Sequence, residues 1–293
     1  MDGLLIVDKP AGYTSHDVVA RVRRIAGEKS VGHLGTLDPM ATGVLPLVLG
    51  RFTRLTQFYN DADKRYQGVI RFGLATDTYD AEGQPAGPEQ PVDLSLDRVR
   101  SAAAGFVGKL QQIPPPFSAK KISGVPAYKL ARKGQPVELQ PKEVEIKEFE
   151  INSWDGKDAH FSAWVSSGTY LRTLAHDLGR VLGPGAHLKE LKRTAVREFR
   201  LEEAHKLDVV EQTASGNSLN DLFLHPRLIL PEFPAVTAPE EAIVKLRHGA
   251  AINLPEFTKA TTVRVFRGQR ELLAIARRVA GTLFQPKIVL MGN

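Results

Sequence analysis

The stretch that most restricts the fold of this chain runs from residue 32 to residue 46. Four of its first twelve residues are Gly or Pro, so it can neither continue a helix nor form a central strand. An apolar run at 44–49 follows at once and predicts a buried strand. Asp38 therefore lies in a loop at the edge of a core element, where catalytic groups are often found. An Asp before Pro is, however, more often a turn residue whose carboxylate accepts a backbone hydrogen bond.

Length and composition predict a globular protein of the cytoplasm. The chain has 293 residues, enough for one large domain and a small one. It has no cysteine, which excludes disulfides, thiolate nucleophiles and Cys-based zinc sites and suits a reducing compartment. The first apolar run is too short for a signal peptide, and no stretch approaches the roughly 20 apolar residues of a membrane span.

Positive charge is concentrated in two segments of the chain. The net charge is +6; residues 109–142 hold seven basic residues against one acid, and residues 231–293 hold nine against five. Such clustering is typical of proteins that bind nucleic acid. Charge alone leaves open the alternative that these are solvated surface lysines and arginines.

The apolar pattern predicts a mixed order of strands and helices. Strands are expected at 4–7, 44–49, 64–72, 143–151, 161–166, 188–196 and 199–201, and helices at 14–25, 95–104 and 169–182, with a short one around 55–59. The irregular alternation favours an α+β fold. Leu171, Leu174, Leu178 and Val181 form the expected apolar stripe of one helix. The segment 109–142 has little to bury and is predicted to be an inserted, mobile, basic flap. Beyond a boundary near 230–234, a helix at 240–247 and short strands predict a small β-rich module.

Several kinds of chemistry are excluded by missing motifs. The sequence contains no phosphate-binding loop, no dinucleotide fingerprint, no serine nucleophile elbow and no His-Glu-x-x-His pair, and its eight histidines are scattered. We therefore expect neither a metal nor a cofactor. One well-placed acid and a basic surface remain. A carboxylate can act at a sugar carbon, but a glycosidase needs two, whereas an enzyme that acts on a nucleobase flips its target and stacks it on an aromatic ring.

Four separated motifs resemble those of the bacterial tRNA pseudouridine-55 synthases, the TruB family. They are GLLIVDKPAGYTS at 3–15, GHLGTLDPMATGVLP at 32–46, SGTYLRT at 167–173 and HLKELKRT at 187–194. The resemblance extends from residue 3 to about residue 201 and, more weakly, over the C-terminal module. It implies a pseudouridine synthase fold, with a mixed, largely antiparallel central sheet flanked by helices. It also implies a catalytic domain at 1–230 with an RNA-clamping insertion at 109–142, followed by a PUA-like RNA-binding domain at 231–293.

The resemblance also implies roles for individual residues. Asp38 corresponds to the essential aspartate of the family. His33 is implied to open the T loop and hold the place of the uridine. Tyr66 matches the tyrosine that stacks on the flipped base, an interaction worth about 1–3 kcal/mol per base.

Three further site residues follow from the third and fourth motifs. Tyr170 is implied to contact the uracil edge, Arg172 to pair with Asp38, and Leu191 to line the pocket. The chain departs from the family at Arg197, where glycine is expected.

The sequence therefore predicts an enzyme that converts uridine to pseudouridine at position 55 in the T loop of tRNA, acting as a monomer. A non-catalytic RNA-binding or RNA-folding protein is one alternative, because the charge clusters alone would suit it. A pseudouridine synthase that acts on another RNA is the second alternative.

Overall fold

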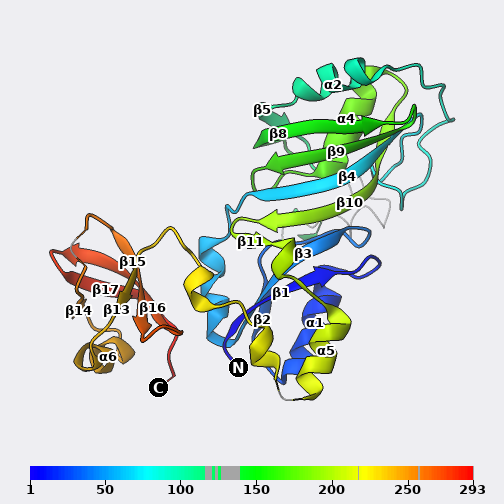
Figure 1. The fold of residues 1–293 in the computed structure, drawn as a ribbon. Helices are drawn as coiled ribbons and strands as arrows, with labels where there is room; N and C mark the ends of the chain where they lie inside the picture. The colour runs from blue at the N-terminus through cyan, green and yellow to red at the C-terminus, as the bar shows by residue number, and fades with distance from the viewer. Residues whose placement is uncertain (116–120, 123–124, 127–138, 217, 257, 293) are drawn as a thin grey trace. The chain divides into compact units, whose positions relative to one another are not determined.

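The structure is a computed structural model that describes all of the chain except residues 116–120, 123–124, 127–138, 217, 257 and 293. The chain divides into two compact units (Figure 1). The first comprises Met1–Asp38, Val44–Asn60 and Glu198–Asn293, and the second comprises Pro39–Gly43 and Asp61–Arg197. Both combine strands with helices, which confirms the predicted α+β class.

The N-terminal part of the first unit is a small sheet with β1 between β12 and β3. Its elements up to residue 228 are β1 Gly3–Lys9, α1 Ser15–Ala26, β2 Val31–His33, the greater part of β3 Thr42–Leu49, the 3-10 helix η1 Gly50–Phe58, β11 Phe199–Arg200, η2 Leu201–Glu203, β12 His205–Lys206, α5 Leu207–Ser215, η3 Leu219–Leu222 and η4 Pro226–Leu228. The strand order is β12-β1-β3, and β2 pairs antiparallel with β3. Helices α1 and α5 lie side by side (Figure 1) and are joined by the ion pair of Arg21 and Glu211.

Helix α1 begins and ends within one residue of its predicted range, 14–25. The Thr14 hydroxyl accepts a hydrogen bond from the Asp17 amide while the Asp17 carboxylate accepts one from the Thr14 amide, which forms a capping box. Gly27 ends the helix in the left-handed region at φ 59°. Val18, Val19 and Val22 are buried on one face, so the amphipathic pattern fixes which side of α1 meets the core.

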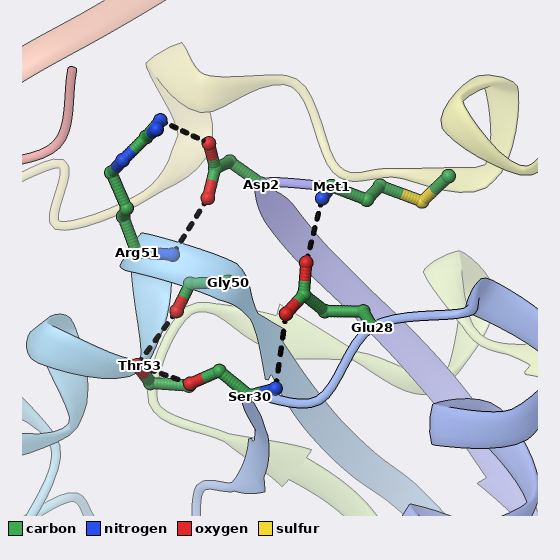
Figure 2. Close-up of polar contacts among 7 residues, drawn as sticks. All are labelled: Met1, Asp2, Glu28, Ser30, Gly50, Arg51 and Thr53. Atoms are coloured by element: carbon green, nitrogen blue, oxygen red, sulfur yellow. Dashed lines mark hydrogen bonds and ion pairs between the residues drawn. The ribbon is translucent and has the colours of Figure 1, made fainter. Parts of the chain in front are cut away.

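Polar contacts hold the start of the chain onto the first unit (Figure 2). The terminal ammonium of Met1 pairs with Glu28 at 2.7 Å. The Asp2 carboxylate accepts hydrogen bonds from both the backbone amide and the guanidinium of Arg51, each at 2.6 Å. These contacts fix the N-terminal end of β1 against the first turn of η1.

The second unit is built on a largely antiparallel sheet. It contains β4 Lys64–Phe72, α2 Leu96–Ala104, β5 Gly108–Gln112, β6 Lys121–Ile122, β7 Val125–Pro126, β8 Lys142–Trp154, β9 Asp158–Val165, α4 Leu171–Leu182 and β10 Ala186–Val196. The strand order is β10-β4-β9-β8-β5. At the β10 edge, Thr42 and Gly43 of β3 pair in parallel with Lys192 and Arg193. Helix α2 packs on β8, α4 packs on β10 and the two helices touch, so they cover one face (Figure 1).

One local prediction is confirmed in outline and one is wrong. The short helix predicted around residues 55–59 is present as a 3-10 helix that ends at Phe58, with Tyr59 as its C-cap. Val181 is 64% exposed, and Leu182 continues the buried stripe of α4 in its place. Counting from Leu178, the residue four positions on, Leu182, is buried, whereas the residue three positions on, Val181, is exposed. A helical period of 3.6 residues is compatible with either position, so the sequence alone does not decide which one is buried.

The predicted basic flap at 109–142 lies mostly outside the described residues. Its first residues belong to β5, where Lys109–Gln112 pair with residues 142–145 of β8. Lys142, its last residue, is the first residue of β8.

The C-terminal part of the first unit forms the predicted small β-rich module. It contains β13 Ala235–Thr237, α6 Glu240–Arg247, β14 Ile252–Asn253, β15 Thr262–Arg267, β16 Glu271–Ala280 and β17 Leu283–Val289, with the strand order β13-β15-β16-β17-β14. The guanidinium of Arg264 is buried and donates hydrogen bonds to the carbonyls of Arg227, Ile229 and Phe233 at 2.6–2.8 Å. Because burial disfavours its charge, the pKa of Arg264 is lowered.

Arg197 occupies a backbone position that suits glycine. It lies between β10 and β11 at φ 52°, in the left-handed region, which explains the glycine expected there from the family. We predict that Arg197→Gly leaves the free energy of unfolding within about 1 kcal/mol of wild type, since relief of strain offsets the added chain entropy. Arg197→Val should lower it by about 2 kcal/mol, because a β-branched residue is an outlier at positive φ. Urea denaturation of both variants checks this, and equal midpoints would contradict it.

Candidate active site

Asp38 lies in the irregular loop between β2 and β3. His33 is the last residue of β2 and pairs with Leu47 of β3. After it the Leu34 amide bonds to the Pro46 carbonyl at 2.9 Å, which closes the base of the loop. Asp38 is half-buried, and Leu37 before it is buried. The acid is therefore accessible and follows a residue fixed in the core.

Tyr66 and Leu191 share one face of the sheet in the second unit. Tyr66 pairs with Arg193 of β10, and Leu191 pairs with Gly68 of β4, so the two side chains are diagonal neighbours. Tyr66 is 6% exposed and Leu191 7%. A Cβ at Gly68 would lie 2.4 Å from the Glu190 carbonyl oxygen, so this close approach requires glycine. The structure brings these two predicted site residues together.

Tyr170 is held by a residue that the sequence did not single out. It is the N-cap of α4 and half-buried. The Gln112 side chain accepts a hydrogen bond from the Tyr170 amide at 2.7 Å and donates one to the Tyr170 carbonyl at 3.1 Å. Gln112 is 2% exposed at the end of β5, so it anchors the start of α4 to the sheet edge.

Arg172 forms a buried ion pair with Asp80. A nitrogen of its guanidinium lies 3.4 Å from the Asp80 carboxylate, and the two side chains are only 6% and 5% exposed. The same nitrogen donates to the Thr78 carbonyl at 3.3 Å. Asp80 in turn accepts hydrogen bonds from the Thr78 hydroxyl at 2.6 Å and from the Glu82 amide at 3.1 Å. A buried charge of this kind requires such partners.

The loop that carries Asp80 is fixed on both sides. Tyr79 stacks on His176 of α4 with 3.8 Å between ring centroids, although its backbone is strained at φ 65°. On the other side the Tyr79 carbonyl accepts a hydrogen bond from the Leu188 amide at 2.9 Å, and the Ala81 amide donates to the Leu188 carbonyl at 3.0 Å. Burial lowers the pKa of His176 and raises that of Tyr79. Both rings are thereby kept neutral near pH 7.

Positive charge gathers near Tyr66. Lys64 lies two residues before it in β4, and its ammonium donates to the Ala62 carbonyl at 2.7 Å. Burial, together with repulsion from Arg193 and Lys142, lowers the pKa of Lys64 to about 8. This region is therefore electrostatically suited to an anion.

The predicted site residues are distributed over the two units. His33 and Asp38 belong to the first, and Tyr66, Tyr170, Arg172 and Leu191 to the second. The predicted pairing of Asp38 with Arg172 stays a prediction. Asp80 and Gln112 were not identified from the sequence as residues of the site. A polar segment, Thr76-Asp77-Thr78-Tyr79-Asp80, is visible in the sequence, but its pattern does not tell which acid is buried.

Comparison with known proteins places the chain in a family. Residues 23–171 match the model of the TruB family pseudouridylate synthase N-terminal domain, and residues 172–231 match that of the tRNA pseudouridylate synthase B C-terminal domain. The chain belongs to the TruB family of pseudouridine synthases. It is 43% identical to the tRNA pseudouridine synthase B of Solibacter usitatus (strain Ellin6076), over 99% of this chain and 100% of that protein. The relative from Geobacter sulfurreducens is 39% identical, with 96% and 95% covered.

Solved structures of other proteins share the fold of this chain. The crystal structure of the archaeal box H/ACA sRNP Nop10–Cbf5 complex contains a chain with a TM-score of 0.70 and 26% identity, covering 99% of this chain and 86% of that one. A structure of an H/ACA RNP bound to a substrate RNA containing 2′-deoxyuridine has a TM-score of 0.72 at 24% identity, with 99% and 85% covered, and shares the fold. In the described part of this chain, the helices are too short or too polar to cross a membrane.

Proposed function

We propose that this protein isomerises the uridine at position 55 in the T loop of tRNA to pseudouridine, with Asp38 as its catalytic residue. As a member of the TruB family the chain is an enzyme, and its relatives are named tRNA pseudouridine synthase B. It converts uridine to pseudouridine in tRNA. The choice of position 55 and the catalytic role of Asp38 are our proposal.

The reaction is balanced without an external reagent. The bond between N1 of uracil and C1′ of ribose breaks, the base rotates, and C5 bonds to C1′. N1 gains a proton and C5 loses one, so no electrons enter or leave. A carboxylate can serve such a sequence by attacking C1′, by adding to C6 or by taking a proton from C2′. Each of these three steps would use the Asp38 carboxylate.

The position of Asp38 is the observation that carries this proposal. The acid is half-buried in a loop closed by the β2–β3 pairing, directly after a buried leucine and directly before a proline. A catalytic carboxylate needs an accessible side chain on a fixed backbone, and this loop supplies both. A protein that only binds RNA gains nothing from such an arrangement.

The face that carries Tyr66 and Leu191 supports base flipping. We propose that the flipped uracil stacks on Tyr66, contacts Leu191 and meets Tyr170 at its edge, while His33 takes the place of the base in the T loop. Lys64 and its basic neighbours supply positive potential beside Tyr66 for the RNA backbone. The basic segment 109–142 and the module at 231–293 are proposed to bind the T stem-loop. The protein is proposed to act as a monomer in the cytoplasm.

Analysis of cellular tRNA tests the proposal. Mass spectrometry of tRNA from a strain lacking this gene should show uridine at position 55, and the wild-type gene should restore pseudouridine. Pseudouridine retained at position 55 would favour a synthase that acts on another RNA. In vitro, the purified protein should convert a T stem-loop RNA; binding without conversion would favour an RNA-folding protein.

A further inference from the structure

A single buried hydroxyl holds the residue that precedes Asp38. The Ser15 hydroxyl oxygen accepts a hydrogen bond from the Leu37 amide at 2.8 Å, and the same hydroxyl donates to the Leu37 carbonyl at 3.2 Å. Ser15 is 2% exposed and Leu37 3%. One side chain thus pairs both backbone polar groups of a buried loop residue.

These two hydrogen bonds fix the backbone on the N-terminal side of Asp38. The Leu37 amide belongs to the peptide plane before Leu37, and the Leu37 carbonyl belongs to the plane that ends at the α-carbon of Asp38. On the C-terminal side Pro39 restricts Asp38 to extended conformations, because its ring clashes with an α-helical residue before it. Between a fixed plane and a proline, the backbone of Asp38 has little freedom left.

Ser15 is itself held by a rigid frame. It is the first residue of α1, whose N-cap is Thr14. Before the helix, the fully buried Lys9 donates hydrogen bonds to the carbonyls of Pro10 and Tyr13 at 2.9 and 2.6 Å, which shapes the β1–α1 turn. The frame therefore links the first sequence motif to the second across 22 residues.

We infer that Ser15 is a positioning residue, which holds the backbone of Leu37 so that the Asp38 carboxylate points in its productive direction. This inference rests on the proposed role of Asp38. A carboxylate displaced by about 1 Å can lose about 100-fold in rate. Removal of the Ser15 hydroxyl should therefore reduce the chemical step and spare RNA binding.

Thr14 supplies a matched control for this test. Its hydroxyl caps the same helix, but it is exposed and bonds to Asp17 rather than to the loop. The test compares Ser15→Ala with Thr14→Ala in the otherwise unchanged protein. For each variant it measures the single-turnover rate at saturating tRNA, the Kd for tRNA and the Tm. Both variants should lose a few degrees of Tm. Only Ser15→Ala should lose rate, by about 10–100-fold, with an unchanged Kd.

Two outcomes would overturn the inference. The first is a rate for Ser15→Ala within about fivefold of that for Thr14→Ala, which would reduce Ser15 to a structural residue. The second is rapid hydrogen exchange of the Leu37 amide in the unmodified protein, since a hydrogen-bonded, buried amide is protected from exchange. This measurement uses the wild-type protein, so it does not depend on whether a variant folds. Asp38→Asn separates the two proposals, because full activity of that variant would refute the catalytic role of Asp38 whatever Ser15 does.

Discussion

Asp38→Asn is expected to abolish pseudouridine formation while the protein stays folded and binds tRNA. The substitution keeps the shape of the side chain and removes its charge, so it removes a nucleophile or base without opening a cavity. We expect the single-turnover rate to fall by at least about 10⁴-fold, the scale for losing a group on which the chemistry depends. Release of tritium from tRNA labelled at C5 of uridine measures the rate.

A matched control for this variant is Asp93→Asn. Asp93 is exposed in the segment before α2, so the same change of charge there should leave the rate as it is in wild type. Filter binding should give Asp38→Asn a Kd for tRNA close to that of the unmodified protein. A rate for Asp38→Asn near that of the control would show that the carboxylate takes no part in the chemistry.

Much of the architecture could be predicted because its signals are local. Thr14 and Gly27 mark the ends of α1, the run at 64–72 gives β4, and residues 240–247 give α6, all at the observed positions. Such signals depend on neighbours within one or two turns. At the C-terminal end of α4, the sheet beneath the helix decides which face is buried. There the prediction that Val181 belongs to the buried stripe is wrong.

The candidate site was predictable only in part, for the same reason. Asp38 and Leu191 lie in motifs that can be read as continuous strings, and Tyr66 lies in the predicted strand at 64–72. Asp80, the buried partner of Arg172, is 92 residues away from it in the sequence. It follows Asp77 in a polar loop, and nothing local distinguishes the two acids; only the packing of this loop between α4 and β10 buries one of them.

Asp80→Asn is the second change for which we expect a large effect. It removes the charge of one partner from the buried ion pair of Asp80 and Arg172, and breaking a buried ion pair in this way costs about 3–5 kcal/mol. We expect the free energy of unfolding to fall by about 3 kcal/mol in urea denaturation. The single-turnover rate should fall as well, by about 100-fold, because Arg172, the predicted partner of Asp38, then loses one of the contacts that orient it.

Asp77→Asn is the control within the same loop. Asp77 is exposed, and its carboxylate accepts one hydrogen bond, from the Gln84 amide at 2.8 Å, so this change should cost under about 1 kcal/mol. The double variant Asp80→Leu/Arg172→Met removes both charges and should regain most of the stability, since apolar side chains can replace a buried pair. Its activity should stay low. Recovery of activity together with stability would mean that the pair serves only to hold the fold, whereas recovery of stability alone would mean that the pair is also needed for the reaction.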